Sequence, residues 1–179
     1  MINKNKLLLF TIITLLTLAL SSCSLFYKTY SRDDAKISET RFDEIIEALN
    51  NKDSETLKAM FSSNALKEAD NIDEDIEYLM DFYKGEIISM ESAREGSDSK
   101  DGDDREIDLK TLNFVSTDED EYIVFYIDNL TDTKDPDNVG LDMLQIIKQS
   151  DRKTQFDWGG DKTYCKGIYR PPTAETTTD

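Results

Sequence analysis

Apolar residues recur every three or four positions in the first half of the chain, which is the spacing of amphipathic helices. The longest such stripe consists of Phe42, Ile45, Ile46 and Leu49. We expect Ser38 to cap this helix, because a serine hydroxyl can accept a hydrogen bond from a free backbone N–H of the first turn. Further caps at Asp53, at Ser63 and near Asn71 or Asp73 predict three shorter helices.

The apolar period changes to two after Gly85, where we expect the last of these helices to stop. A period of two is typical of β-strands, and it predicts strands at residues 86–95 and 105–117, joined by a polar loop. Within the second strand, the apolar positions change phase after Lys110, which predicts a β-bulge near Lys110 and Thr111.

Residues 122–127, with the sequence YIVFYI, are apolar at every position. Such a run predicts a central strand that is covered on both faces of the sheet. A fourth strand is expected at residues 141–147, and a last short one within residues 156–169. Helices followed by strands predict an α+β fold, in which N-terminal helices pack on a curved antiparallel sheet of four to five strands.

A short apolar run occupies residues 7–20, directly after Lys4 and Lys6. It is too short to cross a bilayer, which takes roughly 20 apolar residues in a helix. A basic start, a short apolar middle and small residues at the end are typical of a secretory signal. The run ends in LSSC, which resembles the lipobox of bacterial lipoproteins, where the signal is cut before a cysteine that carries lipid. An ordinary signal peptide with a coincidental cysteine at position 23 is the alternative.

We therefore predict a lipoprotein signal peptide at residues 1–22 and lipid attachment at Cys23. The mature chain would have 157 residues (179 minus 22), which suits one domain. We expect a tether at residues 23–36, a single domain at 37–171 and a disordered tail at 172–179. The protein would then be anchored by lipid to the cell membrane, on its extracytoplasmic face.

The chain is strongly acidic, with 38 acidic and 21 basic residues and a net charge of −17. Removal of residues 1–22 takes away two lysines and no acid, which leaves 38 acidic and 19 basic residues and a net charge of −19. Such a surface repels nucleic acid, so we expect no nucleic-acid partner. The charge either serves solubility or attracts a cationic partner. Nothing in the sequence predicts the oligomeric state.

Several chemistries are excluded because the chain contains no histidine. Ser–His–Asp and Cys–His catalysis and imidazole-ligated metals all need that side chain. The stretch SDSKDGDD resembles a calcium loop, but Ser97 and Ser99 stand where ligating acids are needed. We therefore expect no metal and no cofactor. Once Cys23 carries lipid, Cys165 has no disulfide partner, and we interpret it as a structural thiol.

Four residues are candidates for a ligand pocket: Tyr83, Tyr126, Trp158 and Asp161. The two tyrosines come from the last helix and the central strand, and Trp158 is the only tryptophan. Trp158 and Asp161 flank a Gly–Gly pair that permits a tight turn. If the sheet and helices enclose a cavity, these groups would make it apolar with a few hydroxyls. The alternative for Trp158 is an anchor that packs a loop onto the fold.

The order of helices and strands resembles the nuclear-transport-factor-2-like cone fold, which is also described as cystatin-like. Within that order, the segments RFDEIIEALNNKDSETLKAMFS, WGGD and GIYRP, together with the LSSC motif, resemble one family of Gram-positive lipoproteins. That family is catalogued as domain of unknown function 5104. The resemblance extends over residues 37–171, and it implies a fold and an anchor but no activity.

Three classes of function remain. The first, which we favour, is a non-enzymatic binding or accessory domain that holds a small apolar ligand or a peptide. The second is an immunity-type lipoprotein that captures a cationic toxin or peptide. The third is an enzyme with an Asp–Tyr pair in the cone, as in ketosteroid-isomerase-like proteins, although no aspartate in the sequence is marked as catalytic.

Overall fold

The structure is a computed structural model that describes residues 32–172. The predicted signal peptide at residues 1–22, Cys23 and the end of the predicted tail lie outside the described residues. Within the described residues, one compact unit begins at residue 34. Among the described residues, no helix combines the length and the apolar character that a membrane span requires.

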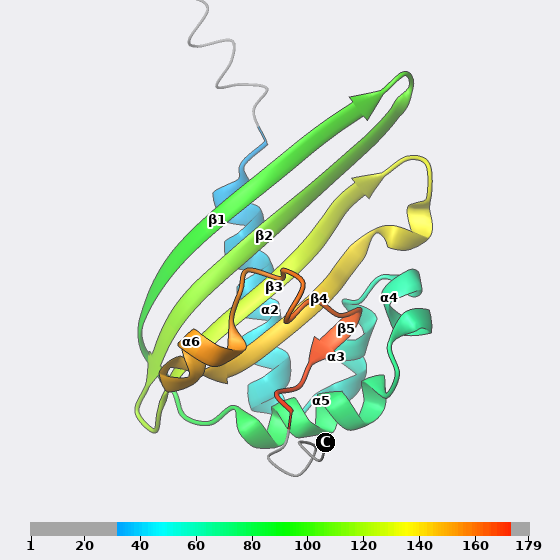
Figure 1. Cartoon of the computed structure of the whole chain (residues 1–179). Coiled ribbons are helices and arrows are strands. Elements are labelled where there is room, and N and C mark those ends of the chain that lie inside the picture. Colours follow the sequence, from blue (N-terminus) through cyan, green and yellow to red (C-terminus); the bar gives the residue numbers. More distant parts are fainter. Residues whose placement is uncertain (1–31, 173–179) are drawn as a thin grey trace, which may run out of the picture. The chain divides into compact units, whose positions relative to one another are not determined.

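Four helices come first in this unit: α2 (Asp34–Asn51), α3 (Ser54–Ala59), α4 (Ser63–Glu68) and α5 (Ile72–Phe82) (Figure 1). The predicted stripe of α2 is confirmed, since Phe42, Ile45, Ile46 and Leu49 are all buried. The predicted cap at Ser38 is wrong, because the helix begins four residues earlier, at Asp34. An acidic residue in the first turn favours that start through the helix dipole. Ser38 lies inside the helix, where its hydroxyl donates to the Ala35 carbonyl at 2.9 Å.

For the three shorter helices, the observed cap residue is the predicted one in two cases. Asp53 caps α3 by accepting from the Thr56 N–H at 3.0 Å, and Asn71 occupies the cap position of α5. The cap of α4 is Ser62 rather than Ser63, and its hydroxyl accepts from the backbone N–H three residues on. Helix α5 ends at Phe82 and not at the predicted glycine.

Five strands follow: β1 (Ile87–Asp101), β2 (Asp104–Thr117), β3 (Glu121–Asp132), β4 (Gly140–Lys148) and β5 (Gly167–Tyr169). They form one sheet in the order β1-β2-β3-β4-β5. The α+β prediction is confirmed, with one correction: β5 pairs with β4 in parallel, so the sheet is only mostly antiparallel. Between β4 and β5 the chain runs through the short helices η2 (Gln149–Asp151) and α6 (Arg152–Gln155) and a loop, and η1 (Pro136–Asn138) joins β3 to β4.

The predicted loop between the first two strands is much shorter than expected. Both strands continue to Asp101 and Asp104, which are paired, so only Gly102 and Asp103 form the turn. Gly102 has φ +62°, and a glycine at the first of two turn positions matches the twist of a hairpin. Polar side chains suggested a loop, but both strands remain paired because a hairpin needs only backbone hydrogen bonds and a suitable turn.

The predicted bulge near Lys110 and Thr111 is also wrong, since the β2–β3 register shifts between Ile107 and Asp108 instead. The change of phase has a different cause, which is that this part of the sheet is covered on both faces. Leu112 and Phe114 point away from the helices and join a second apolar cluster.

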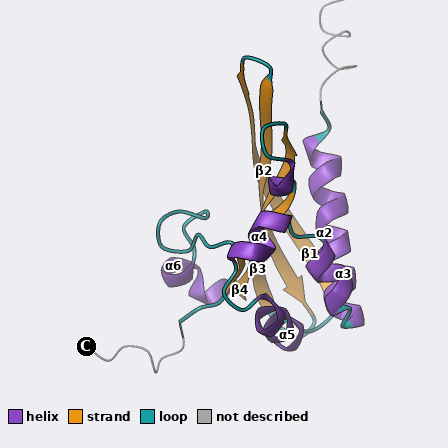
Figure 2. Cartoon of the chain, turned by 90° about the vertical axis from the view of Figure 1, so that its right-hand side faces the viewer, coloured by secondary structure: helices purple, strands orange, loops and turns teal. Residues whose placement is uncertain are grey.

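The central position of β3 is confirmed, because its side chains alternate between two apolar clusters. Tyr122, Val124 and Tyr126 pack with the helices. Ile123, Phe125 and Ile127 pack on the other face with residues of the C-terminal segment. Figure 2 shows the sheet nearly edge-on, with α2 on one side and α6 and the following loop on the other. The sheet is therefore the middle of three layers.

Candidate functional site

The four candidate residues lie on opposite faces of the sheet, so the structure does not bring them together in one pocket. Tyr83 and Tyr126 are buried in the cluster beneath the helices. Trp158 and Asp161 belong to the loop on the other face. The two pairs are separated by β3 and its neighbours, and no ligand of small size can contact all four.

Tyr83 and Tyr126 are core residues. The Tyr83 ring lies 4.9 Å from the Tyr122 ring, and burial raises the pKa of Tyr83 to about 12. Tyr126 is fully buried, and its hydroxyl donates to the Ser38 carbonyl at 2.6 Å. Burial also raises the pKa of Tyr126. Both phenols therefore stay protonated at neutral pH and act as apolar packing groups with one polar atom each.

Trp158 packs the C-terminal loop onto the sheet. Its ring lies 6.1 Å from that of Phe125, edge to face, and 5.6 Å from that of Phe156. Trp158 has φ +62°, a left-handed conformation that is costly for a side chain other than glycine. Gly159 follows with φ +65°, and a Cβ there would lie 3.1 Å from side-chain atoms of Phe125 and Ile127. The loop backbone thus approaches the sheet closely, and the indole anchors it.

The carboxylate that orders this loop is Asp157, whereas the predicted Asp161 is exposed. Asp157 accepts from the backbone N–H groups of Gly160 at 3.0 Å and Lys162 at 2.9 Å, and from the hydroxyl of Thr163. Burial by itself raises the pKa of this carboxyl, but its three hydrogen bonds outweigh burial and hold the pKa below its usual value. The hydrogen bonds of Asp157 therefore give the loop a defined conformation.

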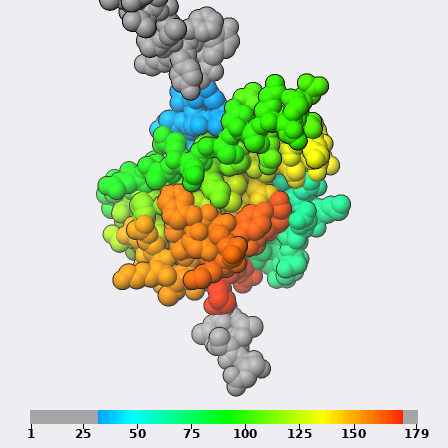
Figure 3. All heavy atoms as spheres, turned by 45° about the horizontal axis from the view of Figure 1, so that its top comes forward, coloured from blue at the N-terminus to red at the C-terminus, as the bar shows by residue number. Residues whose placement is uncertain are grey.

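A cavity of about 290 Å³ lies between this loop and the outer face of β2, β3 and β4. Figure 3 shows the C-terminal segment, in orange, lying across the sheet next to the green β1–β2 hairpin. The cavity is lined by Glu106, Asp108, Lys110, Ile127, Asn129, Asn138, Asp142, Gly159, Tyr164 and Lys166. We call it the loop pocket. None of the four predicted residues lines it, although Gly159 is the neighbour of Trp158.

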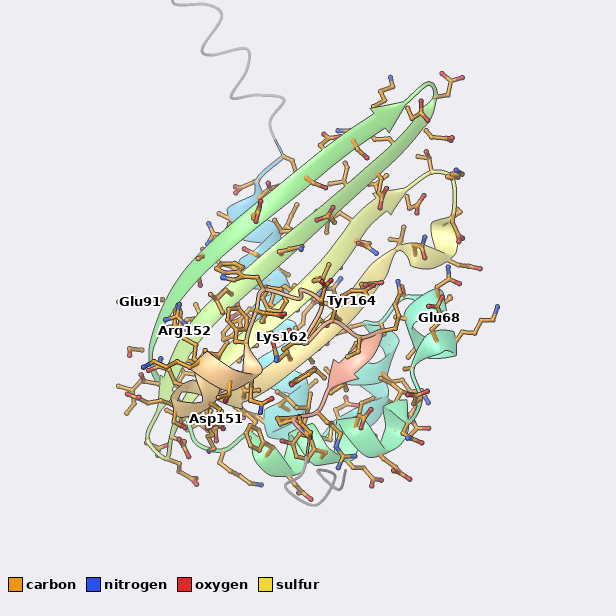
Figure 4. The ribbon with its side chains drawn as sticks, in the orientation of Figure 1. Glu68, Glu91, Asp151, Arg152, Lys162 and Tyr164 are labelled. Atoms are coloured by element: carbon orange, nitrogen blue, oxygen red, sulfur yellow. The ribbon has the colours of Figure 1, made fainter. Side chains whose placement is uncertain are left out.

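An ion pair lies at the base of the loop pocket. The carboxylate of Asp142, a residue that is 4% exposed, accepts from the Lys166 ammonium at 2.5 Å and from the Tyr164 hydroxyl at 2.8 Å. Burial by itself lowers the pKa of Lys166, but the hydrogen bond and charge of Asp142 outweigh it and raise the pKa. Burial and the same carboxylate raise the pKa of Tyr164. The three groups hold one another as carboxylate, ammonium and neutral phenol, and Figure 4 shows Tyr164 on the loop above the sheet.

The rest of the lining carries both signs of charge. Lys110 is half-buried, and its ammonium has no ion-pair partner among the described residues. Glu106 and Asp108 provide carboxylates on the same strand, and Asn129 and Asn138 provide amides. Polar groups of opposite charge at fixed positions select a ligand by orientation rather than by apolar area.

A larger groove of about 470 Å³ lies between α2 and α3. Its lining consists of Arg41, Glu44, Glu47, Ala48, Asn51, Asp53, Thr56, Ala59 and Met60. Most of these side chains are exposed. Arg41 pairs with the buried Asp128, but Asp128 itself does not line the groove, whereas Asp142, Tyr164 and Lys166 all line the loop pocket. We therefore regard the loop pocket as the better candidate site.

Cys165 lies between Tyr164 and Lys166 but does not resemble a nucleophile. The thiol is free and half-buried, and burial together with nearby aspartates raises its pKa to about 11. A thiol with that pKa stays protonated and unreactive at neutral pH. In the described part of the chain, no group of three or more Asp, Glu or Cys side chains is placed to hold a metal ion.

Residues 44–149 match a protein family described as a domain of unknown function (DUF5104), which is more than half of the chain. The chain belongs to this family. The DUF5104 match extends from α2 to the end of β4, and so includes Asp142 and Lys110 but not the loop with Trp158 or the GIYRP segment. No curated protein matches the chain.

Sequence reasoning missed the ionic group of the loop pocket, although one signal was present. Asp142 is an acid within an otherwise apolar strand, LDMLQII, and a charged residue in such a strand has to be paired when it is buried. The same signal marks Asp128 at the end of the YIVFYI strand. Neither signal identifies the partner, which comes from a distant part of the chain.

Proposed function

We propose that this DUF5104 protein is a lipoprotein that Cys23 anchors to the extracytoplasmic face of the cell membrane, and that its folded domain is a non-enzymatic binding module. The anchor is supported by the short apolar run and the LSSC motif. The binding role is supported by one observation above all, the loop pocket with its buried group of Asp142, Tyr164 and Lys166.

The pocket favours a small polar ligand over an apolar one. Its lining contains a single large apolar side chain, Ile127. It offers the ammonium of Lys110 and the carboxylates of Glu106 and Asp108, of which Asp108 already accepts from the Ser97 hydroxyl. A ligand with both a carboxylate and an ammonium group, such as an amino acid or a short peptide, could pair with both. The Asp142–Lys166 pair would act as a fixed dipole at the base of the pocket, because each charge is already balanced by the other.

The Asp–Tyr enzyme alternative finds less support. Tyr126 and Asp128 do lie on the same face of β3, but the Tyr126 hydroxyl already donates to the Ser38 carbonyl. The Asp128 carboxylate already accepts from the Arg41 guanidinium at 2.9 Å. A general base has to be free to take a proton from a substrate, and a phenol donor has to be free to reach it.

The binding proposal is tested with the full chain in mild detergent, titrated calorimetrically against a panel of amino acids and dipeptides. Substitution Lys110→Gln should weaken binding by about tenfold or more, because it removes the free ammonium. Lys153→Gln makes the same charge change on α6, outside the pocket, and should leave binding unchanged. Equal effects of the two substitutions, or no binding by any member of the panel, would contradict the proposal.

The anchor has its own test, in which incorporation of a labelled fatty acid is followed in a bacterial host. Cys23→Ala should abolish labelling and leave the signal peptide uncleaved, while the matched control Cys165→Ala should be labelled normally. Continued labelling of the Cys23→Ala variant would contradict lipid attachment at that residue.

A further inference from the structure

Among the described residues, the first strand of the sheet has no strand paired to its outer edge. In the described sheet β1 pairs only with β2, and all 15 of its residues are exposed. Figure 1 shows β1 as the outermost strand. A free edge is a ready template for another strand, and natural proteins usually shorten it or place lysine or proline on it. This strand is long, contains no proline and has a single lysine, Lys100.

The pairing with β2 determines which backbone groups of β1 are free. Asp101 and Asp104 flank a two-residue turn, so they form the hydrogen-bonded pair next to it. The register is uninterrupted from Ser89 to Asp101. Because hydrogen-bonded pairs alternate along an antiparallel ladder, the odd-numbered residues face β2 and the even-numbered ones, including Ser92, Arg94 and Gly96, direct their N–H and C=O groups outward. We call these outward groups the β1 edge.

Side chains beside the β1 edge are acidic on one face and apolar at one end. Glu91 and Glu95 lie opposite Phe114 and Lys110 in the register, so they share the face of the sheet that is opposite the helices. Figure 4 labels Glu91 beside β1. On the other face, Met90 is 39% exposed, and Ile88, two residues earlier in the chain, is 70% exposed. Residues 86–104 contain seven acidic and two basic residues.

We propose that the β1 edge binds an extended, cationic peptide segment, which adds to the sheet as a sixth strand. Backbone hydrogen bonds to the outward groups would supply most of the affinity, and side chains would supply selectivity. A segment that alternates basic and apolar residues fits best, because successive side chains of a strand point to opposite faces. Its basic residues would lie beside Glu91 and Glu95, and its apolar residues would cover Met90.

The β1 edge and the loop pocket meet where Glu95 lies opposite Lys110 in the β1–β2 register, but no residue of β1 lines the pocket. The two proposals can therefore fail independently. The charge of the protein supports a cationic occupant over a second copy of the chain, because two copies would each bring a net charge of −17 to the contact.

The test uses the full chain in mild detergent and a fluorescently labelled peptide of alternating lysine and valine residues. Arg94→Pro removes one outward N–H and leaves the ladder to β2 intact, since proline is tolerated where an edge N–H faces solvent. Arg94→Thr makes the same charge change but keeps the N–H. We expect Arg94→Pro to weaken binding at least about tenfold relative to Arg94→Thr. Binding to the parent protein should also fall as salt rises from about 50 to about 500 mM.

A second measurement keeps the proposal testable if the proline variant does not fold. Hydrogen exchange of the parent protein should slow at Ser92, Arg94 and Gly96 when the peptide binds. Three results would overturn the proposal: equal binding by folded Arg94→Pro and Arg94→Thr, no added protection at these amides, or a dimer of the free protein that Arg94→Pro converts to a monomer. The last result would assign the β1 edge to a second copy of the chain.

Discussion

The guanidinium of Arg41 on α2 donates to the carboxylate of Asp128 on β3, with 2.9 Å between Nε and Oδ2. The Asp128 side chain is 2% exposed and that of Arg41 is 24% exposed. The pair therefore connects the long helix to the central strand through a charge that is almost completely buried. The Asp128 charge raises the pKa of Arg41, although burial by itself lowers it.

Removal of one partner should destabilise the domain more than removal of both. Arg41→Met leaves the Asp128 carboxylate buried without a counter-ion, and we expect a loss of about 2–3 kcal/mol. This is below the ~3–5 kcal/mol of a fully buried pair, because Arg41 is partly solvated. The double variant Arg41→Met, Asp128→Leu should recover most of the loss. Urea unfolding followed by circular dichroism measures both, and equal losses in the single and double variants would contradict the buried-charge account.

Two tyrosines in the same core should respond differently to loss of the hydroxyl. Tyr126→Phe removes the bond to the Ser38 carbonyl, which should cost about 1 kcal/mol. The hydroxyl of Tyr83 is buried and has no partner among the described residues, so Tyr83→Phe should be neutral or stabilising. Thermal and urea unfolding of the two variants side by side give the comparison. A larger loss for Tyr83→Phe would mean that its hydroxyl has a partner.

Alanine substitutions at two glycines with left-handed backbone should distinguish the cost of backbone strain from the cost of steric crowding. Gly102→Ala and Gly159→Ala both force alanine into positive φ, at a cost of about 1–2 kcal/mol. At Gly102 a Cβ meets no other atom within 4 Å, whereas at Gly159 it meets Phe125 and Ile127 at 3.1 Å. We therefore expect Gly159→Ala to cost roughly 1–3 kcal/mol more. It should also shift the fluorescence of Trp158, and Gly102→Ala should not.

The stability of the loop should depend on pH in the acid range. The pKa of Asp157 is below its ordinary value of 3.8 in the folded protein, because its hydrogen bonds outweigh burial. A depressed carboxyl pKa contributes stability above the unfolded pKa, and that contribution is lost as the pH falls through the folded pKa. The free energy of unfolding should therefore be constant near neutral pH and decrease below about pH 4.

Asp157→Asn is the matched control for this dependence. The variant removes the titrating group, so part of the decrease in acid should disappear while the other depressed carboxyls, at Asp53, Asp120 and Asp132, keep the rest. Trp158 fluorescence across the pH range reports on the loop itself. An unchanged acid dependence in Asp157→Asn would show that Asp157 does not contribute to it.

The helices and strands of the fold could be predicted from the sequence because their signals are local. The stripe on α2 and the apolar run of β3 follow from the directions in which a helix and a strand present successive side chains. Those directions depend only on neighbouring residues, so the order of elements and the α+β class were determined by the sequence. The cap of α3 at Asp53 was predictable for the same reason.

What only the tertiary structure decided depends on contacts between distant residues. The apolar side chain of Leu112 led to the prediction of a bulge. Leu112 is apolar because the C-terminal segment covers the far face of β2, and a pattern of neighbouring residues carries no information about that distant segment. The prediction placed Tyr126 and Trp158 in one pocket because the sequence does not say which face of the sheet each element covers. Asp142 and Lys166 are 24 residues apart, and their 2.5 Å contact exists only because β5 pairs in parallel with β4 and returns the chain to that face. Burial selects such pairs, since a charge removed from water needs a partner, and the packed fold determines which partner it finds.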